Sequence, residues 1–288
     1  MKNFFFVALI SLSVNAFAQK VGNKLTFQKG EKLEITTNMN STSTSQMMGQ
    51  SMESTTGSTF QSVYEVGNAS PDSASMIVQV KRIKFDAQMM GRNETFDSDN
   101  ADDLKDNIGK MIKPILDKKY TVTVNTTGTV TSVKDDVDKK SKSSNNNAMI
   151  GMMMGGAGSD MSTPKIGDAT LFKILPDHEV GKGDTWKSES SSESGKRTTT
   201  YTIADITDND VLIDFTEEST LTNKQQMMGQ DASVDVKSKS TGKIILDRKT
   251  GLLKQKTFLT NSEQNMNLGG MQIPSTSKAT TTITVKVV

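Results

Sequence analysis

The chain contains no cysteine, which excludes disulfides, thiolate metal sites and cysteine nucleophiles together. It also lacks any uninterrupted apolar run of the roughly 18 residues that a transmembrane helix needs. The formal net charge is +1, and it falls to zero when an N-terminal segment carrying Lys2 is removed. We therefore expect no transmembrane segment and no basic surface for nucleic acid.

Recognisable catalytic motifs are absent as well. The sequence has no phosphate-binding loop, no dinucleotide-binding glycine motif and no serine nucleophile elbow. The single histidine, His178, lies in "LPDHEVGKGDTW" beside a proline and a glycine, which favours an ordinary turn residue. We expect a non-enzymatic protein with no catalytic residue and no cofactor.

Residues 1–18 have the pattern of a secretory signal peptide. Lys2 precedes an apolar run from Phe4 to Val14, and Ala16-Phe17-Ala18 forms the small-residue cleavage site. We expect cleavage after Ala18, and no cysteine follows that could carry a lipoprotein anchor. An exported chain without disulfides is typical of the periplasm or the cell surface of a Gram-negative bacterium.

What the sequence does contain is alternation. Val211, Ile213 and Phe215 fall on one face of a strand, and Asp210, Leu212 and Asp214 fall on the other. Short turn words such as "TDND" and "DRKTG" separate such runs. The hydrophobic fraction of 34% is low, as in antiparallel sheets that expose one face to water. The pattern predicts an all-β fold of long antiparallel hairpins that form curved, open or half-barrel-like sheets.

An internal repeat organises these strands. "QMMGQ" occurs at 46–50 and 226–230, and flanking words recur in the same order with nearly constant spacing. We predict a tandem duplication with a first β repeat over 19–142, a linker rich in Ser, Asn, Gly and Met over 143–164, and a second β repeat over 165–288. Whether the repeats form one barrel or two sheets stays open.

One amphipathic helix near 100–116 interrupts the first repeat. Leu104, Ile108, Met111, Ile112 and Ile115 form a single apolar stripe at helical spacing. Acids fill the first turn of the predicted helix and lysines its end, as the helix dipole favours. Pro114 is expected to kink or end the helix, which should lie against a sheet.

The methionine words are expected at hairpin ends, where glycine supplies the positive φ of a tight turn. Their side chains suggest a ligand mouth, with the helix as its lid; the candidate residues are Met47, Met48, Met227, Met228, Leu104 and Ile108. Cu(I) binding is a weaker reading of the methionines, which also include Met89, Met90 and Met152–Met154. Apolar packing is the simpler explanation.

Two other features have a structural and a functional reading. The acids of Asp97–Asp103 resemble the start of a calcium loop, but Asp102 and Ile108 stand where glycine and glutamate belong. A negative helix N-terminus explains them better. Trp186, the only tryptophan, is predicted to be a core anchor at the start of the second repeat rather than a ligand platform.

The stretch "LPDHEVGKGDTW", the Thr-rich strands after it and the closing "ILDRKTGLL" resemble a family of exported β-rich proteins of unknown function from Bacteroidetes-type Gram-negative bacteria. The likeness is good over Leu175–Leu253 and looser over Phe27–Val133, where Leu33 stands at the position of Trp186. This resemblance implies export and a β-rich fold, and no activity.

Three functions therefore stay open. A structural or interaction protein of the envelope or surface is preferred, because sheets filled by their own side chains are the commoner outcome. The alternative is a periplasmic carrier of a lipid or other apolar molecule held between curved sheets. Soft-metal binding is the third.

Overall fold

The structure, a computed structural model, describes residues 19–47, 49–89, 92–135, 163–192, 194–227 and 230–288. Within these ranges the chain forms one curved sheet of twelve strands, a second sheet of two short strands, and two short helical segments. The strands are β1 (Lys20–Val21), β2 (Lys32–Met47), β3 (Gln50–Ala69), β4 (Ser73–Met89), β5 (Arg92–Asp97), β6 (Lys119–Asn125), β7 (Val130–Asp135), β8 (Val180–Gly181), β9 (Thr185–Ser192), β10 (Gly195–Ile206), β11 (Asp210–Met227), β12 (Gln230–Asp247), β13 (Leu253–Leu268) and β14 (Met271–Val287). The helical segments are the 3₁₀ helix η1 (Asp103–Lys105) and α1 (Asn107–Asp117).

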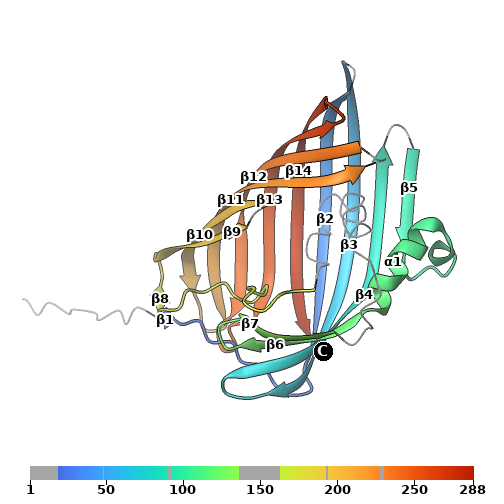
Figure 1. The fold of residues 1–288 in the computed structure, drawn as a ribbon. Helices are drawn as coiled ribbons and strands as arrows, with labels where there is room; N and C mark the ends of the chain where they lie inside the picture. Colours follow the sequence, from blue (N-terminus) through green and yellow to red (C-terminus); the bar gives the residue numbers. More distant parts are fainter. Residues whose placement is uncertain (1–18, 48, 90–91, 136–162, 193, 228–229) are drawn as a thin grey trace, which may run out of the picture.

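The twelve-stranded sheet is antiparallel and open (Figure 1). Its strand order is β7-β6-β4-β3-β2-β14-β13-β12-β11-β10-β9, with β5 also paired to β4. Both the first long strand and the last lie in the middle, because β14 pairs with β2 from Leu33 to Ser45. The end strands β7 and β9 do not pair with each other, so the sheet curves without closing. This confirms the predicted fold of long antiparallel hairpins in a curved, open sheet.

The helical segment interrupts what would otherwise be one long strand. β5 pairs with the Lys84–Met89 half of β4, and β6 pairs with its Ser73–Gln79 half. In the second half of the chain, the single strand β12 pairs along the whole of β11, which has β10 on its other side. The strand order on the two sides of β14 is therefore similar, with η1 and α1 as an excursion in the first half. The tandem duplication and its boundaries stay predictions.

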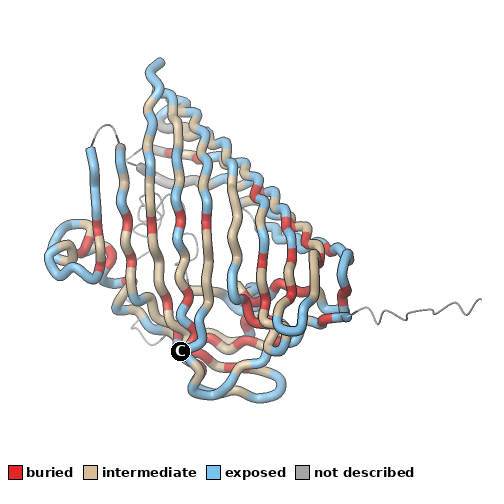
Figure 2. Tube along the Cα trace, turned by 180° about the vertical axis from the view of Figure 1, so that it is seen from behind, coloured by how far each residue is buried: buried red, intermediate tan, exposed pale blue. Residues whose placement is uncertain are grey.

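All three apolar clusters lie toward one end of the long strands. In Figure 2 the buried residues gather in the lower part of the sheet, and the upper part is mostly half-buried or exposed. The largest cluster joins β2 to β8–β13, a second joins β3, β4, β6 and β7, and a third joins β4 and β5 to α1. Trp186 belongs to the first cluster, which confirms its prediction as a core anchor.

The connecting segment Lys165–Glu179 closes this end of the molecule. Its main chain pairs with the β7 side of the sheet, where the Thr170 amide donates to Gly128 and the Val130 amide donates to Asp168. Phe172 is buried and packs edge to face on Phe27, with ring centres 5.7 Å apart. Beyond it, the Trp186 indole donates to the Ile174 carbonyl at 3.2 Å. The segment thus spans from the β7 edge to the β9 edge and covers the apolar end.

The helix forms where the apolar stripe predicts it, with two differences. It begins at Asn107 rather than near residue 100, because Asp106 is extended and separates it from η1. It also continues to Asp117, so Pro114 does not end it, and neither its first turn holds acids nor its last turn lysines. The acids lie upstream, where their side chains bind main-chain amides and compete with helix formation.

The helix packs on the sheet as expected. Ile112 and Ile115 are buried against Ile83, Phe85 and Phe96, and the other members of the stripe are half-buried in the same cluster. This apolar contact, rather than charge at the helix ends, holds α1 in place.

The methionine words fall at hairpin ends. Met47 pairs with Gln50 across the β2–β3 turn, and Met227 pairs with Gln230 across the β11–β12 turn. Met89 and Arg92 flank the β4–β5 turn in the same way. Gly49 has φ of +79°, the positive value for which glycine was expected. The predicted placement of these words at chain reversals is therefore confirmed.

Gly242 lies at a point in β12 where no side chain fits. A Cβ atom there would overlap the Thr257 carbonyl oxygen and the Phe258 side chain of the neighbouring strand. Instead, the rings of Phe215 and Phe258 approach each other across the glycine, with centres 6.0 Å apart. Lys256 lies over both rings, its Nζ 4.5 Å and 5.3 Å from their centres, a cation–π arrangement.

Replacing Gly242 should therefore disturb the sheet. We expect Gly242→Ala to lower the free energy of unfolding by about 1–3 kcal/mol, because the added methyl overpacks two strands. Gly57→Ala is the matched control: it also lies in a long strand, but its Cβ would meet only the flexible Asn40 amide at 3.2 Å. Its effect should stay below about 1 kcal/mol. Equal urea unfolding midpoints for the two variants would contradict this account.

Candidate binding surfaces on the two faces of the sheet

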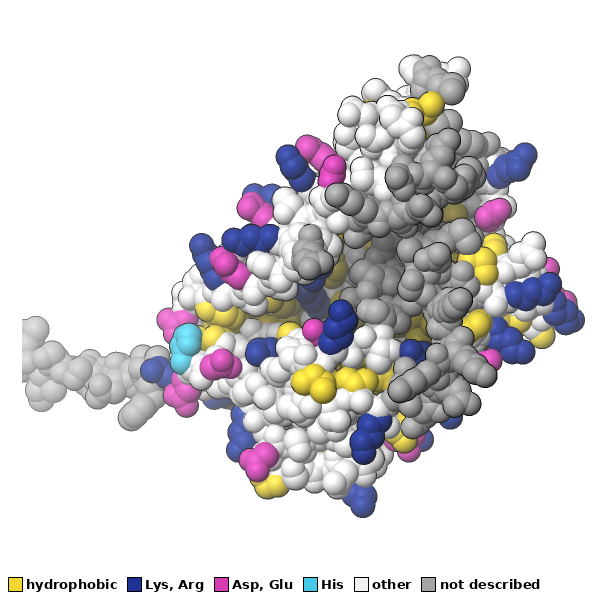
Figure 3. Space-filling model, in the orientation of Figure 1, with side chains coloured by type: hydrophobic (Ala, Val, Ile, Leu, Met, Phe, Trp, Pro, Cys, Tyr) yellow, Lys and Arg dark blue, Asp and Glu magenta, His cyan; other side chains and the backbone are white. Residues whose placement is uncertain are grey.

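The buried side chains of the long strands share one face, here called the inner face. A single row across the sheet shows this: Trp186, Tyr201, Phe215, Gly242, Phe258, Thr281, Met39, Ser58, Phe85 and Phe96 are successive register partners. Six of the ten are aromatic, and we call the whole set of ten the aromatic row. A bulge at Lys81 keeps Val78 and Ile83 on this same face. In Figure 3 hydrophobic side chains likewise gather toward the hollow, with charged ones around the outside.

Beyond the aromatic row the inner face becomes a belt of hydroxyl groups, in which Thr199, Ser219 and Ser240 are buried. Ser58 and Thr281 are buried within the row itself, and Ser62 is buried on the side of the apolar end. Many bind across strands: the Ser219 and Ser238 hydroxyls are 2.7 Å apart, and those of Ser240 and Thr260 are 2.8 Å apart. No buried side-chain polar atom of the described residues lacks a partner. The belt stabilises the sheet laterally where apolar packing ends.

Close to the aromatic row, the inner face also carries the charged residues Arg197, Glu217 and Lys256. The Thr199 hydroxyl donates to Glu217 at 3.0 Å, and the Arg197 guanidinium lies 3.6 Å from the same carboxylate. Burial raises the pKa of the neighbouring Tyr201 phenol, and the Glu217 charge adds to that rise. The hydroxyl of Tyr201 is therefore neutral at physiological pH. These groups are paired with one another or stacked on rings, and they do not converge on an open cleft.

The predicted ligand mouth is only partly described. Met47 and Met227 end their strands, and nothing is described of their side chains; Met48 and Met228 lie outside the described residues altogether. Leu104 and Ile108 are half-buried in the cluster beneath α1, against Phe85 and its neighbours. The mouth, and Cu(I) binding by the methionines, therefore stay predictions. Among the residues that the structure describes, no group of three or more His, Cys, Asp or Glu side chains could hold a metal ion.

The acids of Asp97–Asp103 are used within the fold. Arg82 donates to both carboxylate oxygens of Asp97, at 3.0 and 2.6 Å, and its Nε lies 3.0 Å from Asp99. Asp103 accepts the main-chain amide of Asp97 at 2.8 Å. Because a cation and backbone amides already occupy these oxygens, the segment acts as a structural clamp between β4, β5 and η1. A calcium loop would need the same oxygens.

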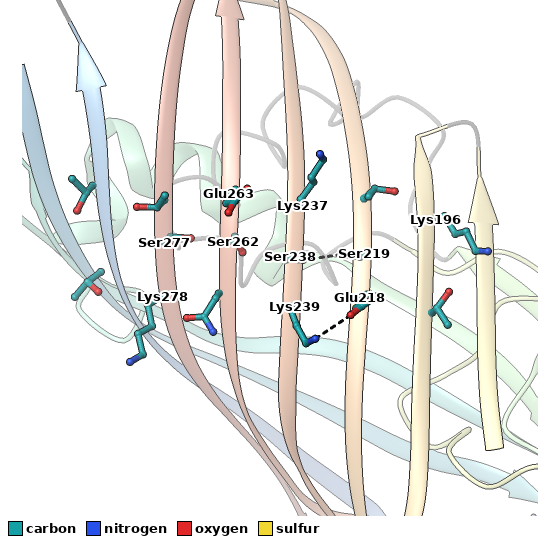
Figure 4. Close-up of a pocket in the computed structure, with 16 residues that line it drawn as sticks. Lys196, Glu218, Ser219, Lys237, Ser238, Lys239, Ser262, Glu263, Ser277 and Lys278 are labelled. Carbon is teal, nitrogen blue, oxygen red and sulfur yellow. Dashed lines mark hydrogen bonds and ion pairs between the residues drawn. The ribbon is translucent and has the colours of Figure 1, made fainter. Parts of the chain in front are cut away.

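A depression opens on the other face of the sheet, here called the outer face. It has a volume of roughly 890 Å³ and is lined by residues of β2 and β10–β14. We call it the outer trough, and Figure 4 shows its side chains. Lining residues are Thr42, Thr44, Lys196, Thr198, Glu218, Ser219, Thr220, Lys237, Ser238, Lys239, Asn261, Ser262, Glu263, Thr276, Ser277 and Lys278. Apart from the four serines, which belong to the inner face, these residues alternate with the inner-face positions, and all of them have polar or charged side chains.

The chain can be placed in a known family. The model of a family of unknown function, DUF6263, matches residues 71–253, well over half of the chain. The chain belongs to this family. The match runs from the β3–β4 turn to the start of β13, so it includes α1 and the segment that closes the apolar end. DUF6263 carries no activity that could be transferred to particular residues.

Other comparisons give architecture at most. No curated protein sequence matches the chain. One similar structure is that of lipovitellin, from work on lipid–protein interactions in that protein; it is 9% identical, with a TM-score of 0.49. The match covers 91% of this chain, but this chain spans only 26% of lipovitellin. An outer membrane channel from Pseudomonas putida F1 is 6% identical, with a TM-score of 0.27 and 92% and 98% of the two chains covered. The translocator domain of the autotransporter NalP from Neisseria meningitidis is 5% identical, with a TM-score of 0.20 and 90% of each chain covered. At such low similarity none of them indicates a ligand or a function.

Membrane crossing by a helix has no support in the described residues, since none of their helices is both long and apolar enough. His178 is exposed, as expected of a turn residue. The outer trough, by contrast, was missed from the sequence. Its signal in the sequence is the recurrence of Lys, Thr and Glu on the polar side of β10–β14, together with the threonines of β2, but only the register shows that they form one surface.

The Arg82–Asp97 pair makes a testable pH dependence. Hydrogen bonding to Arg82 holds the pKa of Asp97 below its ordinary value. Stabilisation from the pair should be complete above the unfolded pKa of about 3.9 and disappear as pH falls through the lower folded pKa. We expect Arg82→Gln to cost about 1–3 kcal/mol at neutral pH and to flatten the acid limb of the stability curve.

Urea unfolding from about pH 2 to pH 7 measures this, with Lys81→Gln, an exposed neighbour, as the control. Adding calcium at neutral pH should leave the melting temperature unchanged. A rise in melting temperature with calcium, lost in Asp97→Asn, would instead support a calcium loop.

Proposed function

We propose that this member of DUF6263 is an exported, non-enzymatic protein of the bacterial envelope or cell surface that acts by binding another envelope component. Its curved sheet is the scaffold, and the outer trough is the contact surface. One observation carries the proposal: the open depression lies on the polar outer face, whereas the apolar residues of the inner face pack on one another.

The packing of the apolar end supports an interaction role over a carrying role. Phe172 and Leu175 of the connecting segment fill the space between β2 and β9–β13, where an apolar ligand would otherwise lie. Trp186 and Leu33, at opposite sides of this cluster, are both buried. A core completed by the chain's own side chains leaves little apolar surface to gain from a lipid.

A second candidate, a carrier of a lipid or another apolar ligand, is favoured by a different feature. Toward the hairpin ends the inner face carries a further set of apolar side chains that are only half-buried: Met52, Leu221, Val236, Met266 and Ile273. Within the described residues the end strands β7 and β9 do not pair, so the sheet stays open. A ligand held there would lie beyond the hydroxyl belt.

Protein purified from its own host separates the two candidates. Native mass spectrometry and organic extraction should find the chain that begins at Gln19 without bound lipid, and apolar dyes should not bind. Cell fractionation should place it in the periplasm or at the surface. A stoichiometric lipid would establish the carrier instead, and an uncleaved chain in the cytoplasm would overturn the proposal.

A further inference from the structure

The outer trough consists of two aligned rows of side chains. The first row is Lys196, Thr220, Lys237, Glu263, Thr276 and Thr44, each the register partner of the next. The second is Thr198, Glu218, Lys239, Asn261, Lys278 and Thr42, two residues further along each strand. Each row crosses six strands, a span of about 24 Å at the usual ~4.8 Å between strands. Such a surface matches an extended polymer that lies across the strands (Figure 4).

The trough has a net positive charge. Four lysines and two glutamates line it, and only Lys239 and Glu218 pair within it, at 3.1 Å. Lys196 pairs with Glu189 at the border, at 3.6 Å. Lys237 and Lys278 form no ion pair with another residue of the described ranges, so both ammonium groups can bind an anion. They lie on different rows, with Asn261 between Lys239 and Lys278.

The remaining lining groups are hydroxyls and one amide, which narrows the class of ligand. None of the described residues that line the trough is aromatic or aliphatic, so these residues include no ring for a stacked base and no wholly apolar side chain for an acyl chain. The main-chain groups beneath it are paired with neighbouring strands, so a peptide cannot add to the sheet there. A polymer that carries both anionic groups and many hydroxyls fits this alternation of lysine with threonine and asparagine.

We infer that the outer trough binds a strand of acidic polysaccharide, with Lys237 and Lys278 donating to its carboxylates and the threonines to its hydroxyls. The inference rests on the proposed function and names the partner of its contact surface. Glu263, which lies opposite Lys237 in the first row, opposes such a ligand and limits its affinity.

Binding of alginate to the mature chain, followed by isothermal titration calorimetry at low and high salt, tests the inference. Lys237→Gln/Lys278→Gln should weaken binding roughly fivefold or more, and Lys237→Arg/Lys278→Arg should retain it. Glu263→Gln should tighten binding by about twofold or more, because a repelling charge is lost. The wild-type affinity should fall with added salt.

The matched control is Lys187→Gln/Lys286→Gln, which removes two exposed lysines of the same outer face from positions that do not line the trough. It makes the same change in net charge and should bind alginate like the wild type. Neutral dextran, a poly-glutamate peptide and anionic phospholipid vesicles of phosphatidylglycerol should bind at least tenfold more weakly than alginate. Thermal melts of every variant confirm that the fold is retained.

The inference is overturned if the wild type does not bind alginate, if the control pair weakens binding as much as the trough pair, or if poly-glutamate or the vesicles bind equally well. Each of these results leaves the interaction role in place, because that role depends on the lipid analysis and on cell fractionation. Recovery of a bound lipid would overturn the interaction role while leaving the trough measurements valid in their own right.

Discussion

The structure depends on one constraint: a single antiparallel sheet must place all its apolar side chains on one face and then cover that face. Because side chains alternate strictly along a strand, the register of ten strands brings the aromatic row into line, from Trp186 to Phe96. Trp186 stacks on Tyr201 with ring centres 5.2 Å apart, and Phe85 stacks on Phe96 at 5.5 Å. A shift of one residue in any strand would turn its share of the row to the outer face.

Covering the inner face is solved differently at different heights. At the apolar end of the long strands, Phe172 and the rest of the connecting segment complete the core, and α1 covers Phe85 in the same way. Higher up, where no helix of the described residues covers the sheet, small hydroxyl residues such as Ser219 and Ser240 bind across strands. Such residues bury little apolar area, so they cost little where cover is thin. This explains a hydrophobic content of only 34% in a chain that nevertheless builds strands of 16 to 20 residues.

Local sequence patterns predicted the strands, the turns and the helix. They could not predict which residues distant in sequence lie side by side in the fold. The alternation around Phe215 and the glycine of the methionine words predicted strands and turns, because both depend only on neighbouring residues. The start of α1 was misplaced because Asp103 and its neighbours bind main-chain amides. The outer trough was missed because Lys237 and Lys278 come together only through the pairing of three strands. Likewise, nothing in the polar stretch before Phe172 indicates that this residue completes a core whose members lie as far apart in sequence as Leu33 and Leu253.

An open sheet of twelve strands also has to protect its edges, and the two ends do so in different ways. At β7, the backbone of the connecting segment pairs with Gly128 in the preceding turn and with Val130, the first residue of the strand, and so occupies groups there that another chain could use. At the other edge, β9 is short and, beyond Trp186, carries exposed serines with Lys187 and Glu189. Charged, flexible side chains on a short strand make edge-to-edge pairing unfavourable. The edge of β5 has the same character, with Arg92 and Glu94. An open sheet is thus compatible with a monomeric chain, and its uninterrupted outer face stays available for a partner.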